Sequence, residues 1–347
     1  MSGQVRAAGA PVAPDVGAAP GEGRPLLSLR SVRIGIRTRK GAREIVRGVD
    51  LDVAPGEKVG IVGESGSGKT LTVLSVLRLL PDPPIELLGE SIRFEGDELS
   101  RMSEKALERV RGAGIAMVYQ DPMTSLNPLL RVRTQIVETL EAHGFSRDAA
   151  LARCREVLLQ VGLSDVERVE RAFPHELSGG MLQRVMIAMA LSVGPRLLIA
   201  DEPTTALDVT IQQQILELVE DLQRRTGMAV IWVTHDLGVV ARLVDRVAVM
   251  YAGRIVELAP TRRLFSRPSH PYTRALLGSL PHRDAAHRRP LTQIGGTPPD
   301  PSRLGAGCPF RPRCPVAVER CAVEEPPLLD RGGGSRAACF VEPELWP

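Results

Sequence analysis

Residues 63–70 read Gly-Glu-Ser-Gly-Ser-Gly-Lys-Thr and fit the phosphate-loop pattern G-x-x-x-x-G-K-[ST]. Such a loop joins the end of a strand to the start of a helix, and the flanking residues predict both. The run KVGIV (58–62) is typical of a buried strand, and KTLTVLSVLRLL (69–80) has the apolar density of a buried helix that ends at Pro81. We therefore expect an α/β protein with a phosphate site between these two elements.

The residue types in this loop suit a triphosphate. The glycines allow successive backbone N–H groups to converge on phosphate oxygens, and the start of the following helix adds a favourable dipole. Lys69 is placed to reach the β- and γ-phosphates, and the Thr70 hydroxyl can bind Mg²⁺. The alternative is a glycine-rich turn with a solvated lysine, which the flanking elements and the scarcity of lysine in this chain disfavour. We expect the whole loop to contact nucleotide: Gly63, Glu64, Ser65, Gly66, Ser67, Gly68, Lys69 and Thr70.

A pair of carboxylates far downstream complements the loop. The apolar run LLIA (197–200) is followed at once by Asp201 and Glu202. A buried strand has no reason of its own to end in two acids, although two solvated acids in a loop would be common for an isolated pair. Beside a triphosphate, Asp201 would bind Mg²⁺ through water and Glu202 would act as the general base on the attacking water.

The rest of the chain alternates between strands and helices. Apolar strands are predicted at 196–201, 229–234 and 246–251, which favours a largely parallel sheet, and residues 132–175 favour an inserted helical subdomain. Residues 1–25 are rich in Ala, Gly and Pro and are expected to be a flexible tail, not a signal peptide. Beyond residue 266 proline becomes frequent, which indicates a linker into a cysteine-bearing end.

Composition excludes some classes of function. Lys plus Arg (44) nearly balance Asp plus Glu (41), and aromatic residues make up only 3%, so neither a broad basic surface nor stacking platforms for nucleic acid are expected. No apolar run reaches the roughly 18 residues of a membrane span. The sequence predicts a cytosolic protein without a nucleic-acid partner.

Two further segments reveal a family resemblance. Leu177-Ser178-Gly179-Gly180-Met181 and Ala206-Leu207-Asp208, together with the phosphate loop and the Asp-Glu pair, resemble the signature, D-loop, Walker A and Walker B motifs of ABC ATPases, in the right order. Gln120 in VYQDP and His235 in VTHD match the Q-loop and the switch histidine. The resemblance implies a nucleotide-binding domain over 26–265, with a RecA-like P-loop core, an antiparallel β subdomain and a helical subdomain at about 132–192.

The resemblance also implies roles for these residues. Ser178, Gly179 and Gly180 would form a second anion site that closes on ATP held by another subunit in a head-to-tail dimer, with Asp208 in the D-loop. Gln120 would couple Mg²⁺ and the attacking water to the helical subdomain, and His235 would contact the γ-phosphate. Simpler alternatives are a helix cap at Ser178, a structural histidine, and a polar residue at a strand end.

Finer similarity is to importers of oligopeptides, dipeptides and nickel, through YQDPMTSLNP (119–128), HPYTRALL (270–277) and GCPFRPRCP (307–315). It implies an ATPase subunit on the cytoplasmic face of the (inner) cell membrane, working with a second identical or related ATPase, two permeases and an extracytoplasmic binding protein. The solute stays open among peptides, nickel and related compounds. A soluble ABC ATPase acting on DNA or ribosomes with a zinc module is the alternative, and a P-loop kinase is a third.

One family feature is absent from the sequence. An aromatic residue that stacks on adenine normally precedes the phosphate loop, yet no Phe, Tyr or Trp occurs before Phe94. Ile36 or a neighbour is expected to pack there instead.

Four cysteines crowd the C-terminal extension at 266–347. Cys308, Cys314, Cys321 and Cys339 are expected to ligate a [4Fe–4S] cluster, because no pair has the C-x₂₋₄-C spacing of structural zinc and similar cysteines occur in members of the importer family that carry a cluster. Disulfides or unligated thiols are the alternatives. Cys154 is expected in the core of a helix and not as a ligand.

Overall fold

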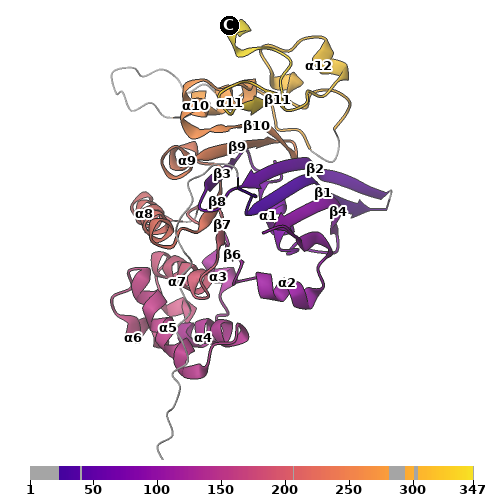
Figure 1. The fold of residues 1–347 in the computed structure, drawn as a ribbon. Coiled ribbons are helices and arrows are strands. Elements are labelled where there is room, and N and C mark those ends of the chain that lie inside the picture. Colours follow the sequence, from indigo (N-terminus) through magenta and orange to yellow (C-terminus); the bar gives the residue numbers. More distant parts are fainter. Residues whose placement is uncertain (1–22, 40, 206, 281–293, 301–303, 347) are drawn as a thin grey trace, which may run out of the picture.

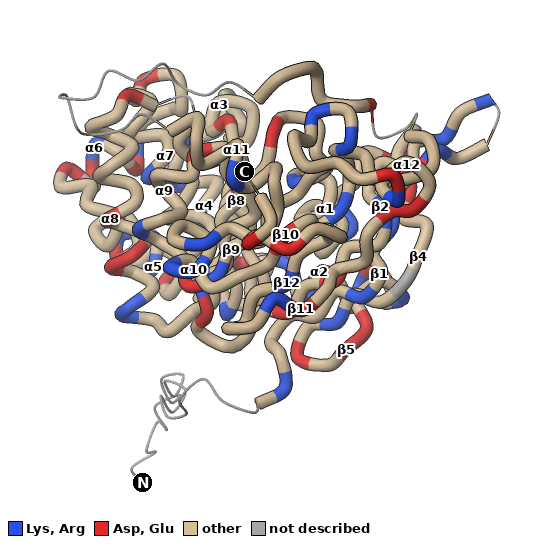
Figure 2. Tube along the Cα trace, turned by 90° about the horizontal axis from the view of Figure 1, so that it is seen from above, with Lys and Arg blue, Asp and Glu red and all other residues tan. Residues whose placement is uncertain are grey.

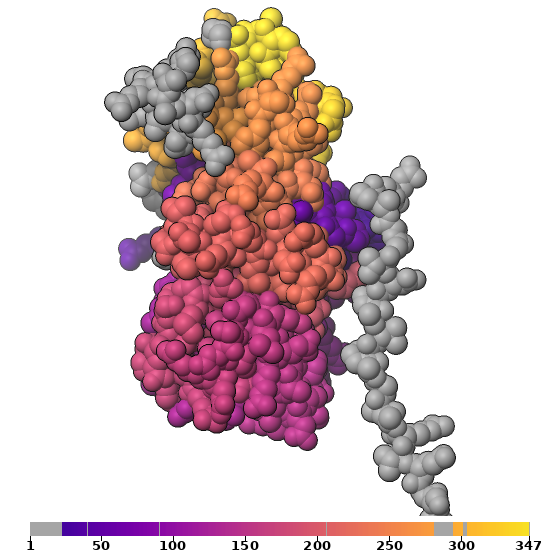
Figure 3. All heavy atoms as spheres, turned by 90° about the vertical axis from the view of Figure 1, so that its left-hand side faces the viewer, coloured from indigo at the N-terminus to yellow at the C-terminus, as the bar shows by residue number. Residues whose placement is uncertain are grey.

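The computed structural model describes residues 23–39, 41–205, 207–280, 294–300 and 304–346. Residues 1–22 of the expected tail and Ala206 of the D-loop lie outside this part. A central region of two sheets separates a helical region from the C-terminal extension, so that these two lie at opposite ends of the molecule (Figures 1 and 3).

The larger sheet forms the core of the nucleotide-binding fold. Its strand order is β11-β12-β10-β9-β3-β8-β7-β6, and the run from β9 to β6 is parallel. These central strands are almost entirely buried, as the continuous apolar runs predicted. The strands are β3 (Lys58–Val62), β6 (Ile115–Val118), β7 (Leu197–Asp201), β8 (Ala229–Thr234), β9 (Arg246–Tyr251), β10 (Arg254–Pro260), β11 (Leu329–Asp330) and β12 (Arg336–Ala337).

This strand order places the predicted motifs together. β3, β8 and β7 are consecutive neighbours and run in the same direction, so their carboxyl ends meet. The phosphate loop follows β3, the Asp-Glu pair ends β7, and His235 follows β8. Ligands of open parallel sheets bind at such carboxyl ends, and three distant sequence motifs therefore converge on one site.

A smaller antiparallel sheet covers the helix that follows the phosphate loop. Its order is β2-β1-β4-β5, formed by β1 (Leu27–Thr38), β2 (Gly41–Val53), β4 (Ile85–Phe94) and β5 (Asp97–Glu98). Helix α1 (Lys69–Val76) contacts β1 and β2 on one side and β7 on the other. The buried core around it joins residues of both sheets, which fixes the loop at its start. The turn η1 (Leu99–Arg101) and α2 (Glu104–Val110) continue the chain toward β6.

The helical region contains α3 (Pro122–Ser125), α4 (Val132–Ala142), α5 (Arg147–Gln160), α6 (Val166–Arg171), η2 (Pro174–Glu176) and α7 (Gly179–Leu191). Ser146 and Asp165 cap α5 and α6 with their side chains, which marks the starts of these helices. Cys154 on α5 is fully buried, and burial raises the pKa of its thiol to about 12. The expectation of a core residue at this position is confirmed.

The remaining helices flank the sheet and build the extension. They are α8 (Val209–Thr226), α9 (Leu237–Leu243), α10 (Thr261–Ser266), α11 (Pro271–Gly278), η4 (Arg311–Arg313), α12 (Arg320–Val323) and η5 (Pro343–Leu345). The extension adds strands to the larger sheet, because β12 pairs with β10 at Glu257 and Leu258. Glu325 forms ion pairs with Arg47 of β2 and Arg254 of β10.

Charge is mixed over the molecule. Basic and acidic residues alternate along the trace seen from above, without a large region of one sign (Figure 2). This agrees with the balance of the composition. None of the helices in the described part of the chain combines the length and the apolar character that a membrane crossing needs.

Candidate nucleotide site

The phosphate loop is held in a conformation that glycine alone allows at two points. A Cβ on Gly63 would lie 2.3 Å from the Met250 carbonyl oxygen. Gly68 has φ +98° where it begins α1. The Ser67 carbonyl accepts a hydrogen bond from the Gly253 N–H, whereas the buried Ser67 hydroxyl oxygen has no partner among the described residues. That polar atom inside the loop fits a loop built to receive an oxygen-rich ligand.

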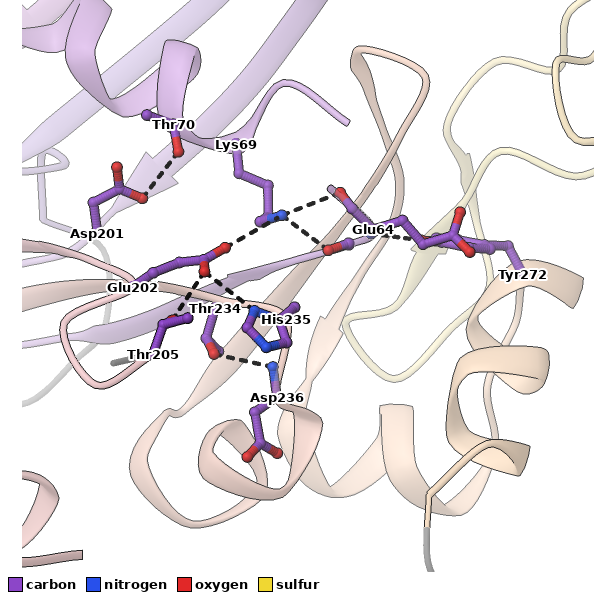
Figure 4. Close-up of polar contacts among 11 residues, drawn as sticks. Glu64, Lys69, Thr70, Asp201, Glu202, Thr205, Thr234, His235, Asp236 and Tyr272 are labelled. Carbon is purple, nitrogen blue, oxygen red and sulfur yellow. Dashed lines mark hydrogen bonds and ion pairs between the residues drawn. The ribbon is translucent and has the colours of Figure 1, made fainter. Parts of the chain in front are cut away.

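Lys69 points into the loop that precedes it. Its side chain is buried, and its ammonium donates to the Gly63 and Glu64 carbonyls at 2.9 and 3.1 Å (Figure 4). Glu202 Oε1 lies 3.8 Å from Nζ. The pKa of Lys69 is lowered overall, because the effect of burial outweighs the opposing effect of the charges of Glu202 and Asp201. The cation is thus held beside the loop by weak partners that phosphate oxygens can replace.

Thr70 and Asp201, the residues expected to bind magnesium, contact each other. The Thr70 hydroxyl donates to Asp201 Oδ1 at 3.1 Å, which places two hard oxygen donors side by side. Burial, helped by the charge of Glu202, raises the pKa of Asp201 to about 6, against the Thr70 hydrogen bond and the charge of Lys69. A buried acid with so little compensating charge fits a site that gains a divalent cation with its substrate.

The backbone conformation of Glu202 directs its carboxylate toward Lys69 and His235. Its φ of +45° is unusual for a residue with a side chain, and its N–H donates to the Val233 carbonyl at 2.9 Å. The carboxylate accepts a hydrogen bond from the Thr205 hydroxyl and lies 3.2 Å from His235 Nδ1. The general base expected from sequence is therefore fixed on several sides.

The structure brings five of the predicted residues together. Thr70 contacts Asp201, and Glu202 contacts Lys69 and His235; the two groups adjoin because Thr70 follows Lys69 and Glu202 follows Asp201 in the chain (Figure 4).

Gln120 is related to this cluster only by the position of the strand that precedes it. It is exposed and lies two residues beyond β6, which pairs in parallel with β7. Gln120 thus stands at the same end of the sheet as Asp201.

The signature and D-loop residues begin two helices. Ser178 caps α7 by accepting from the Met181 N–H, and Asp208 caps α8 by accepting from the Ile211 N–H. A Cβ on Gly180 would lie 2.9 Å from the Ile211 side chain, so the starts of the two helices pack closely. Ser178, Gly179 and Asp208 are exposed. The capping alternative is realised, and the exposed residues remain available to a second subunit.

Glu64, which is expected to contact nucleotide, is bound by residues of the C-terminal extension. Its N–H donates to the Tyr272 hydroxyl at 2.9 Å, and its carboxylate accepts two hydrogen bonds from Arg313. Sequence reasoning missed both partners. Tyr272 lies in the segment HPYTRALL and Arg313 in GCPFRPRCP. These segments indicate a family, but they do not show which distant residue each side chain contacts.

Ile36, expected near adenine, is half-buried on β1, where it pairs with Arg43 of β2 and Ile85 of β4.

The expected iron–sulfur site is not seen as a preformed metal-binding group in the described part of the chain. Within the described residues, no group of three or more His, Cys, Asp or Glu side chains is positioned to hold a metal ion. The disulfide alternative is not realised, because all cysteines are free. One observation nevertheless joins the four thiols of the extension, since a single pocket is lined by Cys308, Cys314, Cys321 and Cys339.

Comparison with known proteins matches both parts of the chain. Residues 46–205 match the family described as ABC transporter, and residues 256–321 match the oligopeptide/dipeptide transporter C-terminal region. The chain is 49% identical over 321 residues to the "Probable peptide ABC transporter ATP-binding protein" of Sinorhizobium fredii, covering 92% of this chain and 96% of that protein. It is also 49% identical to the oligopeptide transport ATP-binding protein of Bacillus subtilis, covering 88% and 85%.

Solved structures of an ABC transporter cassette are also similar to this chain. A dimeric structure of a bacterial ABC transporter cassette matches with a TM-score of 0.60 and 27% identity, covering 68% of this chain and 99% of the cassette. A structure of the same cassette in a post-hydrolysis state, bound to ADP and phosphate, matches with a TM-score of 0.61 and 26% identity.

Proposed function

The chain belongs to the ABC transporter ATP-binding proteins and carries their oligopeptide/dipeptide C-terminal region, and from this premise we propose that it is the ATP-hydrolysing subunit of a peptide importer. The observation that carries the proposal is the cluster of Lys69, Thr70, Asp201, Glu202 and His235 at the carboxyl ends of three adjacent strands. The names of the relatives supply the class of solute.

The residues of the site divide the work of hydrolysis. Lys69 exchanges its two carbonyl partners for phosphate oxygens and neutralises part of their charge. Thr70 and Asp201, with Gln120 from the neighbouring strand, would hold Mg²⁺, which would supply electrostatic stabilisation of the negative charge on the γ-phosphate and on the leaving ADP. Glu202 accepts the proton of the attacking water, and His235 holds the carboxylate in place and contacts the γ-phosphate.

The complete hydrolysis site takes residues from two subunits. Ser178, Gly179 and Gly180 at the start of α7, with Asp208 at the start of α8, serve the ATP held by a second ATPase subunit. The exposure of Ser178 and Asp208 and the dimeric form of the related cassette support this arrangement. Two permeases and an extracytoplasmic binding protein complete the transporter, with this subunit peripheral on the cytoplasmic face of the membrane.

A soluble ABC ATPase acting on nucleic acid is not favoured. In the described part of the chain, Lys and Arg are interspersed with Asp and Glu along the trace (Figure 2), and such a mixture does not favour binding of a polyanion. The C-terminal region from residue 256 matches a transporter family.

The function is tested with the whole transporter. This chain is co-expressed with its permeases and its companion ATPase, and the purified complex is placed in liposomes with the binding protein and labelled peptide. We expect peptide uptake that depends on ATP and an ATPase rate that the loaded binding protein stimulates. ATP-driven uptake of Ni²⁺ without peptide uptake would overturn the proposal that the solute is a peptide. Failure to co-purify with permeases would overturn the proposal that the chain is part of an importer.

We also propose that the four thiols of the extension hold a [4Fe–4S] cluster. They line one pocket and come from two separate segments, 308–321 and 339, so thiolate ligation would tie these segments together. Burial raises the pKa of Cys308 to about 11 and also raises those of Cys314 and Cys339, because it disfavours the charged thiolate form. We expect iron and sulfide, with visible absorption, after anaerobic purification of the full chain and their loss in Cys339→Ser. One zinc per chain, or no metal, would refute the cluster.

A further inference from the structure

A partly buried ion pair joins the C-terminal extension to the phosphate loop. Arg313 donates from Nη1 and Nη2 to the two carboxylate oxygens of Glu64 at 2.8 and 2.9 Å, although 249 residues separate them. The Arg313 side chain is 4% exposed, and its Nη1 also lies 3.3 Å from the Tyr251 hydroxyl. Its guanidinium carbon lies 5.8 and 6.0 Å from the ring centroids of Tyr251 and Phe310. A planar, two-point pair of this kind fixes both position and charge.

The backbone of Glu64 connects this pair to the catalytic lysine. The Glu64 N–H donates to the Tyr272 hydroxyl of α11 at 2.9 Å, and the Glu64 carbonyl accepts from Lys69 Nζ at 3.1 Å. Figure 4 shows Glu64 between Lys69 and Tyr272. One residue of the phosphate loop is thus held by the extension through its side chain and by the lysine through its carbonyl.

The charge of Glu64 would oppose the proposed substrate. A triphosphate bound in residues 63–70 brings several negative charges into the loop that contains this carboxylate. Two anions in a partly buried site repel strongly unless a cation neutralises one of them. In the described structure, the cation in direct contact with the Glu64 carboxylate is Arg313.

We propose that Arg313 is a positioning residue for ATP binding, acting from the extension through Glu64. It neutralises the acid at the second position of the phosphate loop and, with Tyr272, fixes the loop against the extension. Glu325 of the extension pairs with Arg47 and Arg254, and these ion pairs hold the extension beside β2 and β10. The inference rests on the proposed ATP site and adds to it a residue outside the ATPase core.

The test is a double-mutant cycle in the full chain. Binding of a non-hydrolysable ATP analogue with Mg²⁺ is measured by calorimetry for wild type, Arg313→Gln, Glu64→Gln and the double variant. We expect Arg313→Gln to weaken binding at least tenfold and the double variant to bind within about threefold of wild type, because the unpaired acid is then gone. In the assembled complex, Arg313→Gln should raise KM for ATP and leave kcat near wild type.

Two controls separate positioning from a loss of structure. Arg320, an exposed arginine of the same extension, is paired with Glu324, and Arg320→Gln should leave affinity unchanged. Repulsion is screened by salt, so the Arg313→Gln defect should shrink between 0.05 and about 0.5 M salt, whereas a misfolded loop would stay defective.

The outcomes distinguish this inference from the function it rests on. A wild type that binds the analogue, together with an Arg313→Gln variant that binds equally well or is not rescued by Glu64→Gln, overturns the role of Arg313 alone. A wild type that does not bind the analogue overturns the proposed function as well.

Discussion

His235 Nδ1 lies 3.2 Å from Glu202 Oε2, and the same oxygen accepts a hydrogen bond from the Thr205 hydroxyl at 3.0 Å. The other carboxylate oxygen, Oε1, lies 3.8 Å from Lys69 Nζ. The proposed base is therefore oriented before substrate arrives, with the lysine on one side and the histidine on the other. If phosphate oxygens attract the lysine, Oε1 would be left to accept the proton of water.

Replacing Glu202 with Gln should separate binding from turnover. The amide keeps the size of the side chain and can still accept from Thr205, but it cannot take a proton. We expect ATP binding close to wild type, an ATPase rate reduced by at least 100-fold, and an ATP-bound dimer that accumulates in gel filtration. Hydrolysis near the wild-type rate in the purified complex would assign the base elsewhere.

Lys69→Ala should act on binding itself. The substitution removes charge-assisted hydrogen bonds of roughly 1.5–3 kcal/mol to the phosphates, about ten- to a hundredfold in affinity. Titration with ATP and Mg²⁺ measures the effect. Lys58, on the strand before the loop, provides the control, since Lys58→Ala should leave affinity unchanged. Equal affinities for wild type and Lys69→Ala would contradict the assignment.

Ser178 offers a test of the second subunit's contribution. It caps α7, and both Asp and Asn are good caps, so Ser178→Asp and Ser178→Asn should keep the thermal stability of the isolated chain. The added negative charge of Asp should repel the partner's γ-phosphate and suppress ATPase activity of the complex, whereas Asn should retain most of it. Full activity in Ser178→Asp, or a full ATPase rate from an isolated monomer, would rule out the shared site.

The contribution of His270 to stability should be lost in mild acid. It is buried, its Nδ1 accepts the Tyr272 N–H, and burial lowers its pKa to about 3 from an ordinary 6.5. The unfolded chain therefore binds the proton first, so this stabilisation is complete above pH 6.5 and is lost as pH falls from 6.5 toward 3. Between pH 7.5 and 5.5 the loss is about 1.4 kcal/mol.

His270→Asn provides the comparison, because Asn can cap α11 without titrating. The unfolding free energy of the variant, relative to that of wild type, should rise by about 1.4 kcal/mol as pH falls from 7.5 to 5.5. Glu257, which accepts the His270 N–H and has a pKa raised by burial to about 7, acts in the opposite sense but is common to both proteins. Parallel pH profiles for the two chains would show that His270 does not titrate in this way.

The sequence alone was sufficient to predict the motifs and the flanking strands of the nucleotide site, because each of these motifs is local. A glycine-rich loop after one strand and two acids after another are readable from neighbouring residues, and a parallel sheet brings their ends together. The same reasoning failed for Arg313, whose partner Glu64 is 249 residues away and is selected only by the packing of the extension. β11 and β12 span two residues each, too short for any periodicity to reveal them.

The pairing of β12 with β10 has a practical consequence. Glu257 and Leu258 pair with Ala337 and Arg336, and the Ala338 N–H donates to the Val256 carbonyl. Without these partners, the outer backbone groups of β10 would be unsatisfied and could recruit strands from other chains. A protein trimmed to its ATPase core would therefore be prone to aggregate, and the extension protects solubility whether or not its cysteines carry a metal.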